Sequence, residues 1–210
     1  MITTPAETKL VEFLTNEENL PFTVEILRLG DQVRKPILAR FWRDLKCQLD
    51  KMRPPGRAAS MVLRFLPNDR LTDPSNVELD YFESALENES QFLRYCIAPA
   101  QGKGYFEIEY GIAWRDEDNI PATAARLSKL DPMVALRKKL TSMDFKEEDA
   151  WVGWQPLHDC KYYESVEEFL AFIAKAPEEA LGNMADRFWS LVSETLSSVE
   201  EANRAIVGKK

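Results

Sequence analysis

The clearest hydrophobic pattern in the chain lies between residues 36 and 50. Pro36 suits a first helical turn, and six apolar residues behind it recur with the period of one helix face: Ile37, Leu38, Phe41, Trp42, Leu45 and Leu49. Arg40, Arg43 and Lys46 repeat every three residues on the opposite flank. The prolines and glycine at 54–56 end any helix. The sequence therefore predicts a basic amphipathic helix over residues 33–53.

Alternation of apolar and polar residues predicts β-structure in the middle of the chain. The best strand is 105–115, in which Phe106, Ile108, Tyr110, Ile112 and Trp114 alternate with more polar or smaller residues. Residues 58–66 and 91–98 are further strand candidates. A loop at 99–104 with two glycines joins 91–98 to 105–115, so these two strands are expected to form an antiparallel hairpin. Residues 151–157 could add a short strand.

Helical patterns dominate both ends of the sequence. Short helices are expected near 7–14 and 22–29, and residues 120–207 are expected to be mainly helical. Ser165 and Glu168 have capping-box spacing, and a long last helix is predicted from Pro177. The prediction is a single α+β domain over 1–210, with a helical arm at 1–30, the basic helix at 33–53 and a sheet at 58–115. A central antiparallel sheet of three to five strands is flanked by N-terminal and C-terminal helices. The expected core includes Phe41, Trp42, Leu45, Ile108, Tyr110, Ile112, Phe188 and Val192.

Composition narrows the class of protein without naming an activity. The 210 residues are 45% hydrophobic and 30% charged, which is typical of a globular chain. No apolar run is long enough to span a membrane, and the first residues lack the order of a secretory signal, so a cytoplasmic protein is expected. The three cysteines are far apart, which indicates neither a disulfide framework nor a paired-cysteine metal site. No cofactor is expected.

Charge is unevenly distributed around a net value of −8. Eight basic and two acidic residues lie between Val33 and Arg57, whereas residues 78–89 are acidic. Two interpretations stay open for the basic helix. Arg40, Arg43 and Lys46 form a face for a polyanion or a partner, with only weak direct binding of nucleic acid expected. Alternatively, these residues are solvated surface or pair with the protein's own acids.

Two groups of residues carry potential chemistry. His158 is the only histidine, and it stands two residues from Cys160, so a thiol–imidazole pair is conceivable; a zinc site would also need Cys47 and Cys96 from distant segments. Glu107 and Glu109 share one face of the predicted strand, as paired carboxylates of hydrolases do. The plainer interpretation is a solvated strand face for the glutamates and a loop histidine.

The tryptophans at 151 and 154 are the remaining unusual feature. A regular strand would send Trp151 and Trp154 to opposite faces unless Gly153 allows a bulge. Most of the five tryptophans are expected in the core, while Trp151 or Trp154 could instead be an exposed interaction anchor.

From residue 41 onward the order of features resembles the C-terminal accessory part of PD-(D/E)XK nuclease-superfamily proteins of prophages and restriction islands. The resemblance is carried by residues 41–45, the strand 105–112, the segment 151–154 and Phe188-Trp189. The nuclease core needs an Asp and then a Glu-x-Lys, but Glu107-Ile108-Glu109 has no lysine in that place. The resemblance thus implies a relative without the cutting machinery, and no catalytic, cofactor-binding or metal-binding residue is carried over.

These observations favour a non-enzymatic binding or accessory module, with the resemblance implying a setting in bacterial or phage defence and an unidentified protein as its partner. Two alternatives stay open. The acidic chain could mimic nucleic acid and inhibit a DNA-handling enzyme, or a hydrolase could use Glu107 and Glu109 or His158 and Cys160. The sequence leaves the oligomeric state open.

Overall fold

The computed structural model describes residues 5–19, 22, 37, 40–66, 81–86, 92–102, 105–114, 125–148, 150–158, 163–165, 168–169, 171–172 and 177–207. By its contacts the chain divides into two compact units, Met1–Arg40 and Phe41–Lys210. The described part of the first unit includes helix α1 (Pro5–Thr15), which overlaps the helix expected at 7–14. The α+β architecture predicted for the chain lies in the second unit.

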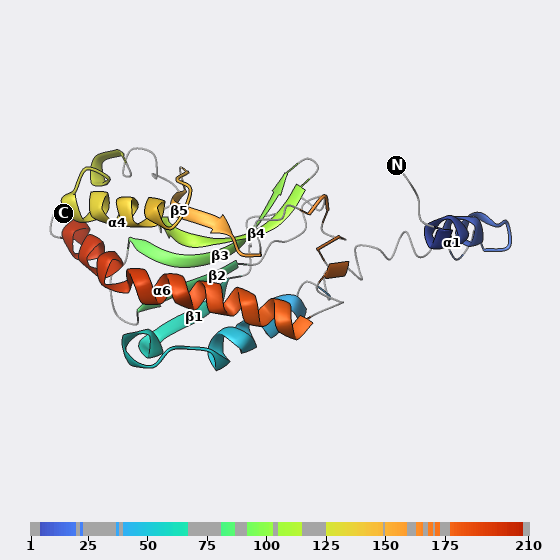
Figure 1. Cartoon of the computed structure of the whole chain (residues 1–210), viewed down its shortest axis with the longest axis horizontal. Helices are drawn as coiled ribbons and strands as arrows, with labels where there is room; N and C mark the ends of the chain where they lie inside the picture. The colour runs from blue at the N-terminus through green and yellow to red at the C-terminus, as the bar shows by residue number, and fades with distance from the viewer. Residues whose placement is uncertain are drawn as a thin grey trace. The chain divides into compact units, whose positions relative to one another are not determined.

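A five-stranded antiparallel sheet forms the centre of the second unit (Figure 1). Its strands are β1 (Met61–Leu66), β2 (Tyr81–Leu86), β3 (Leu93–Gly102), β4 (Tyr105–Trp114) and β5 (Trp151–Pro156). They are ordered β1-β2-β3-β4-β5, so each strand pairs with its neighbours in the chain. The predicted α+β class and the predicted strand number are confirmed. Strand β2 was not predicted.

The hairpin of β3 and β4 is longer than its sequence pattern indicated. Its register runs from Leu93 opposite Trp114 to Gly102 opposite Tyr105, so residues 99–102 belong to the strand and not to the expected loop. Pro99 fits there because the described pairing of β2 with β3 ends at Ile97. One edge of β3 is thus unpaired with β2 at the proline, and edges are where strands tolerate it.

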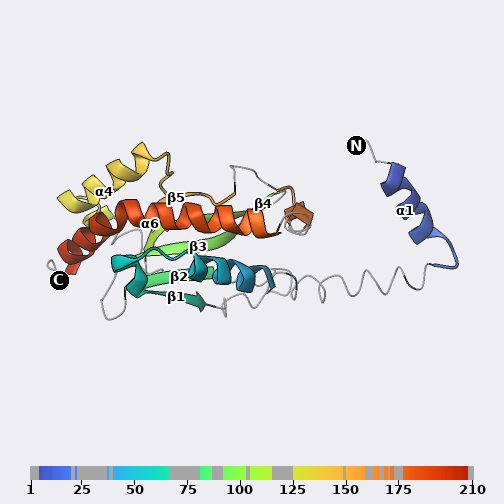
Figure 2. The same cartoon turned by 60° about the horizontal axis from the view of Figure 1, so that its bottom comes forward.

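Helix α6 (Pro177–Val207) covers one face of the sheet, and Figure 2 shows it with α4 (Asp131–Ser142) on that side. The Tyr95 hydroxyl lies 2.9 Å from Thr195 Oγ1 on α6. Nearby, the amides of Phe92 and Leu93 donate to Asn203 Oδ1 at 3.0 and 2.9 Å, and Asn203 Nδ2 donates back to the Leu93 carbonyl. Buried backbone groups at the start of β3 are therefore satisfied by a helix side chain.

The predicted basic helix is described at residues 40–51, and it packs on α6. Its inner residues Phe41, Trp42, Leu45 and Leu49 are buried. Trp189 of α6 donates its indole N–H to the Leu49 carbonyl at 2.8 Å. Such a carbonyl near a helix C-terminus has no partner within its own helix, so the tryptophan supplies one. The prediction that one flank of this helix faces the core is confirmed.

All eight predicted core residues are buried: Phe41, Trp42, Leu45, Ile108, Tyr110, Ile112, Phe188 and Val192. The predicted start of the last helix at Pro177 is confirmed. Ser165 also behaves as the expected cap, because its Oγ accepts from the Glu168 amide at 3.3 Å. No helix in the described residues has the length and apolar content needed to cross a membrane.

Candidate functional site

Two of the three basic residues that were predicted to form a binding face on the 40–51 helix are exposed. Arg40 and Arg43 are exposed, whereas Lys46 is half-buried and its Nζ lies 2.6 Å from Asp50 Oδ2. Asp50 also accepts from Arg53 Nη2 at 2.5 Å. Burial raises the pKa of Asp50, but the hydrogen bonds from Lys46 and Arg53 outweigh it and hold the pKa below its usual value. Lys46 therefore shares the Asp50 carboxylate with Arg53.

The acidic stretch that was expected to pair with this helix falls mostly outside the described residues. Glu78, Asp80, Glu87 and Glu89 are not described, and Glu83 is placed only by its backbone in β2. The pairing of basic and acidic patches stays a prediction.

Trp151 and Trp154 are buried, with 8% and 6% of their surfaces exposed, so neither ring is an exposed anchor. The register explains their common environment. Ile112 lies opposite Gly153 while Ala113 lies opposite Trp151, so the pairing shifts by one residue at a bulge in β5. This extra residue turns both rings to the same side of the sheet, where they pack with Cys96 and Ala113. The core interpretation of the tryptophans is correct, and the anchor interpretation is wrong.

His158 lies among aromatic rings. Its Nδ1 is 2.9 Å from the Tyr163 hydroxyl, and its ring centroid is 4.2 Å from that of Phe172. Cys160 is outside the described residues, so its pairing with His158 stays untested. Cys96 is buried in the sheet and Cys47 is exposed on the 40–51 helix. In the described part of the chain, no cluster of three His, Cys, Asp or Glu side chains could hold a metal ion.

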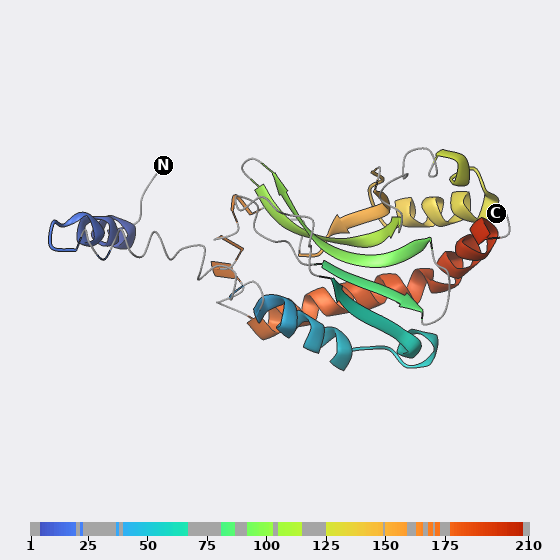
Figure 3. The same cartoon turned by 180° about the vertical axis from the view of Figure 1, so that it is seen from behind.

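Glu107 and Glu109 lie on the sheet face opposite α6, which Figure 3 turns toward the viewer. Strand alternation puts their neighbours Phe106, Ile108 and Tyr110 on the helix-covered face, and it puts both carboxyl groups on the other. Only 3% of Glu107 and 8% of Glu109 is exposed. The expectation of a solvated strand face is therefore wrong for these two residues. Alternation along one strand cannot show whether the second face of the sheet is covered.

Glu107 and Glu109 lie close enough for each to shift the pKa of the other, and we call them the carboxyl pair. Burial raises the pKa of Glu109 to about 8, and the negative charges of Glu107 and Glu148 add to the rise. Burial also raises the pKa of Glu107, although the positive charge of Lys146 and the hydrogen bond with Glu109 oppose the rise. At neutral pH Glu109 therefore holds a proton, because ionising two buried carboxyls side by side is unfavourable.

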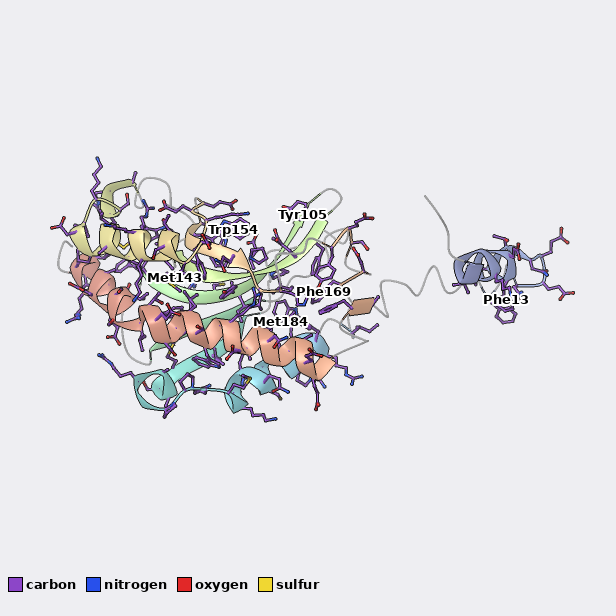
Figure 4. The ribbon with its side chains drawn as sticks, viewed as in Figure 1. Phe13, Tyr105, Met143, Trp154, Phe169 and Met184 are labelled. Atoms are coloured by element: carbon purple, nitrogen blue, oxygen red, sulfur yellow. The ribbon has the colours of Figure 1, made fainter. Side chains whose placement is uncertain are left out.

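Lys146 and Trp154 border the carboxyl pair. The backbones of Lys146 and Trp154 exchange two hydrogen bonds of 2.8 and 2.9 Å, which add residue 146 to the edge of β5. The Lys146 ammonium lies over the Trp154 ring, 5.0 Å from its centroid; Figure 4 labels Trp154 on β5. Two neighbouring carboxyls beside an aromatic ring can exchange protons or bind a cation.

The sequence reasoning did not single out the apolar side chains of α1. Leu10 and Phe13 are 56% and 61% exposed, and they are three residues apart on the same helix face. Figure 4 shows the Phe13 ring projecting from this helix. The helical period of residues 7–14 was the only sequence signal for this face.

No family model matches the chain, and no curated protein or solved structure matches it.

Proposed function

We propose that the chain is a non-enzymatic binding module that recruits another protein through the apolar face of α1. The observation that carries this proposal is the exposure of Leu10 and Phe13 on one helix face. Burying a leucine or phenylalanine side chain stabilises a complex by about 1.5–3 kcal/mol. A partner that covers both residues would therefore gain substantial affinity from them.

Hydrogen bonds among residues 13–19 stabilise the C-terminal end of this helix. Asn19 Nδ2 donates to the Phe13 carbonyl at 2.8 Å, and the Glu18 amide donates to Asn16 Oδ1 at 3.0 Å. These contacts satisfy groups at the helix C-terminus. An isolated helix of 11 residues is nevertheless marginal in water, so a partner's groove would also stabilise the helix itself. A short amphipathic helix in an apolar groove is a common mode of recognition.

The charged residues beside the apolar face of α1 indicate which charges the partner should carry around its groove. Glu12, Glu17 and Glu18 are exposed beside the apolar face, and Lys9 is the only basic residue between positions 5 and 19. A complementary partner has an apolar groove bordered by lysine or arginine. The accessory role in bacterial or phage defence belongs to this proposal as well, and it is supported by the resemblance alone.

The test uses the full-length chain as bait in an extract of its native host. Leu10→Ser and Phe13→Ser should each reduce capture of the partner at least tenfold, while Lys9→Gln, on the same helix, should leave capture unchanged. A peptide of residues 1–19 should displace the captured protein. Apolar anchoring predicts that capture persists at 0.5 M salt. If capture is lost at moderate salt and is insensitive to Leu10→Ser and Phe13→Ser, the nucleic-acid-mimic alternative is favoured and this proposal is refuted.

A further inference from the structure

The carboxyl pair of β4 is a buried charged group that the proposed function does not use. Within the described residues, no ion pair joins Glu107 or Glu109 to a basic side chain, and Glu107 Oε2 has no hydrogen-bond partner. Burying an ionised carboxylate is costly unless it is paired. An unpaired acceptor that is 97% buried marks a position where a donor is missing.

The strands on either side of the pair bring no donor to it. Glu109 lies opposite Ala98 on β3 and Pro156 on β5, and Glu107 lies opposite Ala100. These three neighbours have short apolar side chains, which carry no hydrogen-bond donor. Ala98 and Ala100 are half-buried, and Ala98 packs against the buried cluster of Cys96, Ala113, Trp151 and Trp154.

Trp154 gives a second, independent sign of a ligand on this face. Its ring is 94% buried, yet its indole N–H has no acceptor among the described residues. Trp154 pairs with Gly111, two residues along β4 from Glu109, and its bulged strand turns it to the face that carries the pair. A ligand that satisfies both orphaned groups must donate to a carboxylate and accept from the indole nearby.

Lys146 does not fill this role itself. Its ammonium is held over the Trp154 ring, and it makes no ion pair with either carboxyl in the described structure. Glu148, on the same edge segment, offsets the charge of Lys146. The group comprises three carboxyls, of Glu107, Glu109 and Glu148, and one ammonium, of Lys146, which favours a cation over an anion.

We propose that the carboxyl pair is a binding site for an arginine side chain of a peptide, in which the guanidinium bridges Glu107 and Glu109 and an adjoining carbonyl accepts from Trp154. A guanidinium is a planar fork of donors that suits two adjacent carboxyls better than a single ammonium does. Its fixed charge replaces the proton on Glu109, so binding releases a proton to solvent. The site is independent of α1 and does not rest on its role.

Proton release makes the affinity depend on pH. Since the pKa of Glu109 is about 8 in the free protein, binding should be about tenfold weaker at pH 6 than at pH 7, and it should level off above pH 8. The other described titratable or charged groups on this face are on β4, β3 and the 146–148 segment: Tyr105, Glu107, Arg94, Cys96, Lys146 and Glu148.

The experiment measures binding of N-acetyl-arginine amide to the full chain by calorimetry at pH 6, 7 and 8.5, in two buffers with different ionisation enthalpies. N-acetyl-citrulline amide has nearly the same shape without the charge and is the matched ligand control. We expect the arginine probe to bind with release of close to one proton at pH 7, and the citrulline probe to bind at least tenfold more weakly. N-acetyl-lysine amide should also bind more weakly.

Glu109→Gln keeps the shape of the side chain and removes its charge, so it should abolish binding and the pH dependence together. Glu147→Gln, at an exposed position next to Lys146 where the carboxylate pairs with Arg137, is the control and should change affinity less than threefold. Circular dichroism checks that both variants fold; Glu107→Gln is the second test if Glu109→Gln does not. Three outcomes overturn the proposal: no binding of the arginine probe, equal binding of the citrulline or lysine probe, or unchanged binding by a folded variant of the pair.

Discussion

Replacing Gly111 by alanine tests the close contact between β4 and β5. A Cβ built on Gly111 would lie 2.0 Å from the Gly153 carbonyl oxygen and 2.9 Å from Trp154 Cα. Both atoms are backbone, and real Cβ contacts essentially never fall below 3.0 Å, so the strands must separate locally by about 1 Å. Overpacking of this kind costs about 1–3 kcal/mol, and each ladder hydrogen bond that breaks adds about 1 kcal/mol.

We therefore expect Gly111→Ala to lower the free energy of unfolding by about 3 kcal/mol or more, which for a chain of this length is a fall in Tm of at least roughly 6 °C. Urea denaturation and a thermal melt measure the two quantities. Gly182→Ala on α6 is the matched control, because its new Cβ meets nothing within 4 Å. Removing a helical glycine should raise stability by about 0.5–1 kcal/mol. A Gly111→Ala protein within 1 kcal/mol of the parent would refute the reasoning.

Three further predictions concern single side chains. Ile108 is 3% exposed, so Ile108→Ala should cost about 2–5 kcal/mol in urea denaturation; a loss below about 1 kcal/mol would contradict its place in the core. Trp189→Phe leaves the Leu49 carbonyl without its indole donor and should cost about 1–3 kcal/mol, whereas an unchanged denaturation midpoint would show that this bond contributes nothing. Burial raises the pKa of Glu109 from 4.5 to about 8, so the folded protein holds a proton that the unfolded chain releases, and stability should fall as the pH rises from about 4.5 to 8. Glu109→Gln should flatten that part of the pH–stability curve, and an equally steep curve for the variant would assign the fall to another group.

The sequence predicted elements whose pattern is local and missed those that depend on distant partners. Strand β4 alternates regularly and was predicted nearly to its ends, as was the start of α6 at Pro177. Strand β2 has the sequence YFESAL, in which apolar residues do not alternate. Its pairing with both β1 and β3 defines it as a strand, and that pairing is not visible in six residues of sequence.

The candidate site shows the same division between local and distant information. Side chains alternate between the two faces of a strand, so the sequence alone predicts that Glu107 and Glu109 share a face. Their burial depends on what covers the second face of the sheet, and Lys146 and Glu148 reach them from residues nearly forty positions later in the chain. The burial of Trp151 and Trp154 together depends on the bulge in β5, for which Gly153 was the only sequence signal.

The hydrogen bonds between the Asn203 side chain and the backbone at the start of β3 affect the order in which the chain folds during synthesis. The two partners are 110 residues apart, and at typical rates of about 5–20 residues per second a ribosome needs roughly 5–20 s to make the chain between them. All five strands are made before α6. The nascent sheet therefore has an uncovered apolar face, including Leu93 and Tyr95, until α6 has left the ribosome. Aggregation and chaperone binding should be concentrated in that interval, and slower translation between residues 157 and 207 should lengthen it.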